Sequence, residues 1–164
     1  MRRVCDRLLC IIALCVLVAT SSATDDADQP LLTPDDSRYT AKQAAGFQTM
    51  ADGPLAPIYP MLAEQIIAEF GLTDRPGIGI DLGGGPGTLL LELCKQTRQM
   101  FWIDADINPH NFPFLYKKLA DAGLGHRAGA IFADAHALPF KDGYADIVVS
   151  RGTYQFWEDK PRAF

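Results

Sequence analysis

Cysteine is scarce in most of this sequence. Three of the four cysteines fall within the first 15 residues, which leaves Cys94 alone in the rest of the chain. A single cysteine has no partner within the chain, so the disulfide framework typical of small exported domains is excluded from residues 16–164. Cys94 also falls in the apolar set of an expected helix, where we expect it to face the core.

Excess positive charge and long apolar runs are also lacking. The 164 residues include 15 Lys and Arg against 20 Asp and Glu, a formal charge of −5, so no basic field draws the chain to nucleic acid. The apolar run over residues 8–19 is shorter than the roughly 20 residues that span a bilayer as a helix. With 48% apolar residues, the composition is that of one globular domain without a permanent membrane anchor.

The N-terminus has the pattern of a secretory signal peptide. Three arginines precede the apolar run, and small residues occupy the −3 and −1 positions of a cleavage site after Ala23. We therefore expect residues 1–23 to be removed and the product to be secreted or periplasmic; a mispredicted start codon would instead leave it in the cytoplasm. Residues 24–38 follow with five Asp and two Pro, the composition of an acidic linker.

The remaining residues, 39–164, have the pattern of a single α/β domain. Apolar periodicity predicts a short helix over 39–50 and a second from about Pro60 to Gly71. Four strands then alternate with two helices; the strands are 77–82, 100–106, 127–133 and 144–150, and the helices are 88–96 and 112–122. This alternation predicts a Rossmann-like, doubly wound, mostly parallel sheet with helices on both faces, incomplete at about four strands.

A glycine-rich motif, DLGGGPG at residues 81–87, joins the first strand to the next helix. Glycines let backbone approach a ligand closely, and the helix that follows presents its N-terminal amides to that ligand. The dinucleotide fingerprint starting at Gly83 would require a glycine at position 88, where this chain has Thr88. An NAD-dependent oxidoreductase is therefore the less favoured alternative.

Carboxylates follow the next two strands. Asp106 lies twenty-one residues beyond Gly85 at the end of the second strand, where a carboxylate can accept the hydroxyls of a ribose. Asp134 follows the third strand, where it could read an adenine edge. We expect Asp104 to be a solvated carboxylate at a strand end, and Asp146 to be structural, either a loop carboxylate or a cap.

Four motifs occur in a fixed order along the chain. They are the glycine motif at 81–87, DINP at 106–109, DAHALPF at 134–140, and ADIVVS at 145–150. Together they resemble the class I S-adenosylmethionine-dependent methyltransferases, in particular the branch that acts on small molecules. The resemblance implies S-adenosylmethionine as cofactor and a small-molecule methyl acceptor as partner, over about residues 39–164.

The resemblance also implies roles for particular residues. The cofactor would be bound by Asp81, Gly83, Gly85 and Gly87 at the methionine end, Asp106 and Ile107 at the ribose, and Asp134 and Ala135 at the adenine. Tyr59, Arg151 and Tyr154 would contact the acceptor.

Neither a catalytic side chain nor a metal is implied. A sulfonium methyl is already activated, so holding the acceptor in line can suffice and a dedicated acid or base is not required. The three histidines share no metal-ligand spacing, so we expect no metal. His136 lies beside the expected pocket, where a surface-loop histidine is favoured over a general base.

The chain departs from the family at its C-terminus. It stops at Phe164, whereas family members continue through three further strands, so strand 144–150 is expected to be an apolar edge. Three interpretations follow: the sequence is a fragment, a partner or second copy covers the edge, or the protein is a degenerate relative. The alternative to an active methyltransferase is therefore a non-catalytic, secreted or truncated cofactor-binding fragment.

Overall fold

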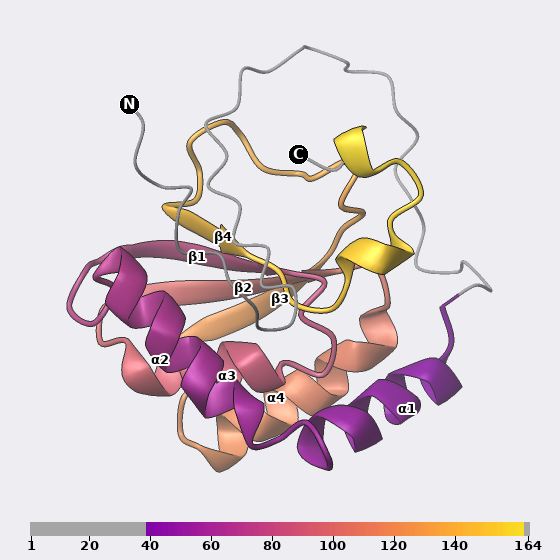
Figure 1. The fold of residues 1–164 in the computed structure, drawn as a ribbon, viewed down its shortest axis with the longest axis horizontal. Coiled ribbons are helices and arrows are strands. Elements are labelled where there is room, and N and C mark those ends of the chain that lie inside the picture. Colours follow the sequence, from indigo (N-terminus) through magenta and orange to yellow (C-terminus); the bar gives the residue numbers. More distant parts are fainter. Residues whose placement is uncertain (1–38, 163–164) are drawn as a thin grey trace, which may run out of the picture.

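The computed structural model describes residues 39–162, so the expected signal peptide (1–23) and acidic linker (24–38) lie outside the described residues. Figure 1 shows a sheet whose strands all run parallel, in the order β3-β2-β1-β4. The strands are β1 (Gly77–Leu82), β2 (Met100–Asp106), β3 (Ala128–Phe132) and β4 (Ile147–Val149). The α/β, Rossmann-like fold expected from the sequence is confirmed.

Four α-helices accompany the sheet in the described part of the chain. They are α1 (Ala41–Asp52), α2 (Ile58–Phe70), α3 (Thr88–Gln96) and α4 (Phe112–Asp121), with single-turn 3₁₀ helices η1 (Pro109–Asn111), η2 (Tyr154–Phe156) and η3 (Lys160–Arg162). α1 begins two residues later than expected because Thr40 caps it: its hydroxyl accepts the N–H of Gln43, and the Gln43 side chain accepts the N–H of Thr40.

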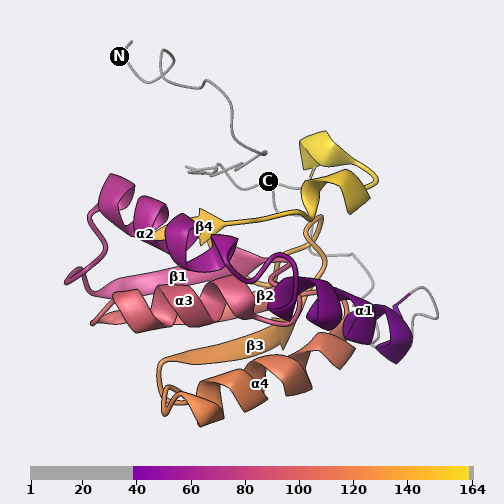
Figure 2. The same cartoon turned by 60° about the horizontal axis from the view of Figure 1, so that its bottom comes forward.

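The larger core lies between the sheet and α2, α3 and α4, which cover one face (Figure 2). Ile66, Leu90 and Leu115 contribute one buried side chain from each of these helices. Trp102 on β2 is fully buried beneath them and donates its indole N–H to Thr97 at 3.1 Å. Burial of these side chains supplies most of the apolar contact that holds the helices to the sheet.

The opposite face of the sheet differs from the expectation of helices on both faces. Its apolar cluster includes Ile80, Ala105 and Trp157, and it contains no residue of α1–α4. Instead, side chains of the β3–β4 connection, such as Leu138 and Phe140, pack there. In the described residues this connection forms no α-helix, so the second face is covered by loop rather than by helix.

β4 is shorter than the expected strand over 144–150, because it pairs only over Ile147–Val149 with β1. Just before it, Asp146 accepts the N–H of Ile78 at 2.9 Å and forms a salt bridge with Arg75 at 3.2 Å. Asp146 therefore caps the junction of β1 and β4, a structural role as predicted. Among the described strands β4 is an edge, paired on one side.

Within residues 39–162, none of the helices combines the length and the apolar character needed to cross a membrane.

Candidate functional site

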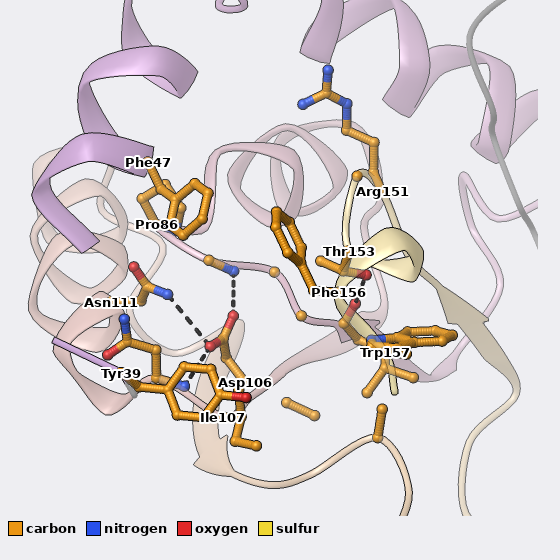
Figure 3. Close-up of a pocket in the computed structure, with 18 of the residues that line it drawn as sticks. Tyr39, Phe47, Pro86, Asp106, Ile107, Asn111, Arg151, Thr153, Phe156 and Trp157 are labelled. Carbon is orange, nitrogen blue, oxygen red and sulfur yellow. Dashed lines mark hydrogen bonds between the residues drawn. The ribbon is translucent and has the colours of Figure 1, made fainter. Parts of the chain in front are cut away.

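A cavity of about 610 Å³ opens at the carboxyl ends of β1, β2 and β3. Its wall is formed by α1, the glycine loop, and the segments that follow β2, β3 and β4 (Figure 3). Ligand sites in open parallel sheets lie at this edge, and the volume is within the range of about 300–1,000 Å³ typical of small-molecule sites. The topology alone therefore places the sequence motifs around one space.

Asp106 is the central polar residue of this cavity, 6% exposed at the end of β2. Its Oδ2 accepts the N–H of Gly85 at 2.8 Å, and its Oδ1 accepts the N–H of Asn108 at 2.7 Å and the amide of Asn111 at 3.4 Å (Figure 3). Burial raises the pKa of Asp106, while these three hydrogen bonds lower it. Within the described residues Oδ2 accepts a single hydrogen bond, which leaves it able to accept another from a ligand hydroxyl.

The glycine loop takes its shape from backbone that other residues rarely adopt. Gly83, Gly85 and Gly87 have φ values of 70°, 59° and 73°, in the left-handed region that favours glycine. Gly83 and Gly85 line the cavity, as expected for residues that contact a ligand. Gly87 does not line it; it caps α3 and packs so closely on Leu115 that a Cβ would overlap that side chain.

Asp81 and Asp104 lie beneath the glycine loop. The parallel register aligns them on neighbouring strands, and they are only 1% and 0% exposed. Asp104 accepts the N–H of Gly84 at 3.1 Å, so the prediction that it is a solvated carboxylate is wrong: the loop folds back over it. Neither Asp104 nor Asp81 lines the cavity, because the glycine loop lies between these two carboxyls and the cavity. The expectation that Asp81 contacts the cofactor is therefore not met in this structure.

The two buried carboxyls have raised pKa values. Burial, reinforced by the charge of Asp106, raises the pKa of Asp81 to about 7. Burial also raises the pKa of Asp104 well above its ordinary value, with the charges of Asp106 and Asp81 acting in the same direction. Asp81 Oδ2 and Asp104 Oδ2 have no hydrogen-bond partner among the described residues, which makes the charged form of each costly.

Asp134 and Ala135 line the cavity directly after β3, where the sequence placed them. Asp134 Oδ1 accepts the backbone N–H of His136 at 2.9 Å and lies 2.6 Å from its Nδ1. His136 Nε2 in turn accepts the N–H of Asp159 at 3.3 Å. Since both ring nitrogens are engaged, His136 has no lone pair with which to act as a general base in this arrangement.

The three expected acceptor contacts do not lie together. Tyr59 and Arg151 both line the cavity, and Arg151 Nη1 donates to the Tyr59 hydroxyl at 2.8 Å. Tyr154 does not line it: η2 turns its side chain outward, where it is 42% exposed and packs edge-on against Trp157 at 5.4 Å between ring centroids. The structure thus brings two of the three residues to the cavity and leaves Tyr154 outside it.

Sequence reasoning missed the contribution of α1. Gln43, Phe47 and Met50 line the cavity from one face of this helix, at offsets of four and seven residues. Phe47 also packs edge-on against Phe156 of η2, with ring centroids 6.1 Å apart. The spacing was visible in the sequence, but nothing local showed that this face would meet a ligand cavity rather than a core.

Cys94 lies in the core and away from the cavity. Cys94 is 1% exposed, so its predicted core position is confirmed, and burial raises its pKa to about 12. In the part of the chain that the structure describes, no three His, Cys, Asp or Glu side chains are grouped so that they could hold a metal ion.

Comparison with known families and structures agrees with the fold. A family model described as "Methyltransferase domain" matches residues 80–164, more than half of the chain. The crystal structure of a putative S-adenosylmethionine-dependent methyltransferase from Methanococcus maripaludis is 38% identical, with a TM-score of 0.72 over 81% of this chain and 59% of that one. A methyltransferase structure from Aquifex aeolicus, 17% identical with a TM-score of 0.61, shares the fold over 76% of this chain and 63% of its own.

Curated relatives are longer than this chain. A 3-hydroxy-5-methyl-1-naphthoate 3-O-methyltransferase from Streptomyces sahachiroi is 27% identical over 85% of this chain and 39% of its own length. A 2-methyl-6-phytyl-1,4-hydroquinone methyltransferase from Spinacia oleracea is 34% identical over 56% of this chain and 25% of its own. The chain thus spans less than half of each. With the family model, the fold and the placement of the motifs in agreement, the chain belongs to the methyltransferase domain family and has its class I fold; S-adenosylmethionine is the cofactor of that family.

Proposed function

We propose that this protein transfers the methyl group of S-adenosylmethionine to a small, cyclic, largely apolar acceptor. The observation that carries the proposal is the bond between Asp106 and Gly85, which holds the glycine loop beside a carboxylate that can still accept a hydroxyl. The loop and the carboxylate form one wall of a cavity large enough for a nucleoside and a second small molecule.

The cofactor would lie along the carboxyl ends of three strands. Asp106 would accept a ribose hydroxyl, with Ile107 beside it, while Asp134 and Ala135 would meet the adenine. The backbone of Gly83 and Gly85 lets the rest of the molecule approach the loop without a side chain in the way. The donors and acceptors present therefore fit S-adenosylmethionine.

The cofactor supplies a methyl group on a sulfonium, which is already activated for transfer. The protein's contribution is then to orient the acceptor and exclude water, the two effects by which a site without an acid or base accelerates a reaction. His136 is engaged at both nitrogens, and burial raises the pKa of Tyr59. Neither side chain is arranged to remove a proton at neutral pH.

The choice of acceptor follows from the cavity wall. Five Phe, Tyr or Trp residues of the described part of the chain line it: Tyr39, Phe47, Tyr59, Phe156 and Trp157. Aromatic walls favour flat, apolar ligands through ring stacking and area burial. By their names, the curated relatives from Streptomyces and spinach methylate a naphthoate and a hydroquinone, which supports testing cyclic acceptors first.

The experiment is binding followed by transfer. Calorimetric titration with S-adenosylmethionine and S-adenosylhomocysteine should give saturable binding at one site. Radiolabelled methyl transfer to hydroxynaphthoates, hydroxybenzoates and alkylated hydroquinones should then give a labelled product. Binding with no transfer to any acceptor would favour a non-catalytic cofactor-binding protein, and absence of binding in a cooperatively folded chain would contradict the proposal.

A further inference from the structure

Tyr59 and Arg151 come from distant parts of the chain and meet at the cavity wall. Tyr59 lies in the first turn of α2, and Arg151 follows β4 by two residues. Arg151 Nη1 donates to the Tyr59 hydroxyl at 2.8 Å, and the guanidinium carbon lies 4.9 Å from the centre of the Tyr59 ring. The two contacts hold the guanidinium in a fixed position at the cavity.

This pair has hydrogen-bond donors to spare. The Tyr59 hydroxyl accepts from Arg151, and its own hydrogen is donated to no residue in the range 39–162. Arg151 has five N–H donors, of which Tyr59 uses one, and none of the salt bridges between described residues includes Arg151. Arg151 is partly buried and lines the cavity, so its remaining donors are available to a ligand bound there.

The surroundings favour an anion at these donors. Among residues 39–162, Arg151 is the only Arg or Lys that lines the cavity. Burial raises the pKa of Tyr59, which keeps its hydroxyl protonated and able to donate. Tyr59 and Leu55 both line the cavity, so α2 starts at this wall, and the positive end of its dipole adds to the attraction.

We propose that Tyr59 and Arg151 form a carboxylate-binding subsite within the cavity, an inference that rests on the proposed function. A planar guanidinium matches a carboxylate through two parallel hydrogen bonds, and the Tyr59 hydroxyl supplies a third. The carboxylate comes from the amino-acid part of the cofactor or from an acidic acceptor. Figure 3 shows Arg151 well apart from Asp106 and Ile107. A cofactor whose ribose is held by Asp106 would therefore leave the Arg151 end of the cavity to its amino-acid part or to the acceptor.

The first arm of the test compares two nucleosides. S-adenosylhomocysteine carries the amino-acid carboxylate, and 5′-methylthioadenosine lacks the whole amino-acid group. The variants are Arg151→Gln and Tyr59→Phe, with Arg98→Gln as the matched control because Arg98 is a surface residue, 73% exposed in its side chain. If the cofactor supplies the carboxylate, Arg151→Gln should weaken S-adenosylhomocysteine binding at least tenfold and Tyr59→Phe several-fold. Affinity for 5′-methylthioadenosine should stay unchanged in both.

The second arm tests an acidic acceptor. Binding of 1-naphthoate and of its neutral analogue 1-naphthamide is measured with and without S-adenosylhomocysteine. If the acceptor supplies the carboxylate, naphthoate binding should fall at least tenfold in Arg151→Gln, whereas naphthamide binding and S-adenosylhomocysteine binding should not change.

Two results would overturn the subsite. In one, neither S-adenosylhomocysteine nor naphthoate binding depends on Arg151 or Tyr59. In the other, 5′-methylthioadenosine and naphthamide lose as much affinity as the acids, which would make the pair a structural tie between α2 and β4. Failure of the unmodified protein to bind any nucleoside would contradict the proposed function instead, and the naphthoate measurements without nucleoside would still decide the subsite.

Discussion

The Asp106 carboxylate accepts the backbone N–H of Gly85 at 2.8 Å, across a separation of 21 residues in the chain. Its other oxygen holds the turn after β2 through the N–H of Asn108. One buried side chain therefore fixes two loops that form neighbouring parts of the cavity wall, and keeps an acceptor position for a ligand between them.

The variant Asp106→Asn tests whether both carboxylate oxygens of Asp106 are needed as hydrogen-bond acceptors. The amide has one acceptor oxygen, so its NH₂ group must face one of the two backbone donors. We expect S-adenosylhomocysteine affinity to fall at least tenfold and the free energy of unfolding to fall by about 1–3 kcal/mol. Calorimetry and urea unfolding measure the two effects, with Asp121→Asn on the exposed surface as control. Unchanged affinity would remove Asp106 from the ribose role.

Gly84 has no room for a side chain. A Cβ there would lie 2.7 Å from Asp104 Oδ1 and 3.0 Å from Asp81 Oδ2, both on buried carboxyls. Gly84→Ala should therefore push the loop outward, destabilise the protein by about 1–3 kcal/mol, and weaken cofactor binding. Gly125→Ala is the control, since a Cβ at Gly125 meets nothing within 4 Å. Equal melting temperatures for the two variants would show that the loop yields without cost.

The raised pKa of Asp81 makes stability depend on pH. An unfolded aspartate titrates near 3.8, whereas burial raises the pKa of folded Asp81 to about 7, so between these values the folded state binds more protons. Its contribution to stability is complete below about pH 4 and is lost as the pH rises to about 7. At about 1.36 kcal/mol per pKa unit, the loss is of the order of 4 kcal/mol.

Asp81→Asn should remove this dependence. As the pH increases from 5 to 8, the free energy of unfolding of the variant should rise relative to that of the unmodified protein, so the difference in stability shifts in favour of the variant. Urea unfolding at several pH values measures this difference, with the exposed Asp74→Asn as control. Parallel pH profiles for Asp81→Asn and the unmodified protein would mean that Asp81 stays ionised in the folded state.

Lys118 on α4 ties α1 to the cavity loop. Its ammonium lies 2.9 Å from Gln48 Oε1, 2.9 Å from the Pro86 carbonyl and 2.9 Å from Asp52 Oδ1, with a side chain only 13% exposed. Burial lowers the pKa of Lys118, and Asp52 partly restores it. We expect Lys118→Met to loosen α1, destabilise the protein by about 2 kcal/mol, and weaken cofactor binding.

Hydrogen exchange of residues 41–52 and calorimetry are the measurements for this variant. Lys117→Met is the matched control, because Lys117 is adjacent, 73% exposed in its side chain, and paired with Asp121 on its own helix. If the backbone amides of α1 exchanged at the same rate in both variants, Lys118 would not anchor the helix.

We also propose that residues 1–23 direct export and are removed after Ala23. Mass spectrometry of the protein recovered from an exporting host should give a mature N-terminus at Thr24. Ala23→Arg should block cleavage, because signal peptidase sites require a small residue at −1. An intact N-terminus with cytoplasmic recovery would instead support a mispredicted start codon.

Local sequence patterns were sufficient to predict the strand, glycine loop and helix at residues 77–96, because apolar periodicity and glycines act over a few residues. The order of the strands also predicted that Asp106 and Asp134 would meet at one edge, since parallel strands end together. Features that depend on contacts between distant residues could be seen only in the folded protein. The strand register placed Asp104 under the glycine loop instead of in solvent, and packing turned Tyr154 outward. Helix α1 became a cavity wall only through contacts such as Lys118 with Asp52, which no local pattern encodes.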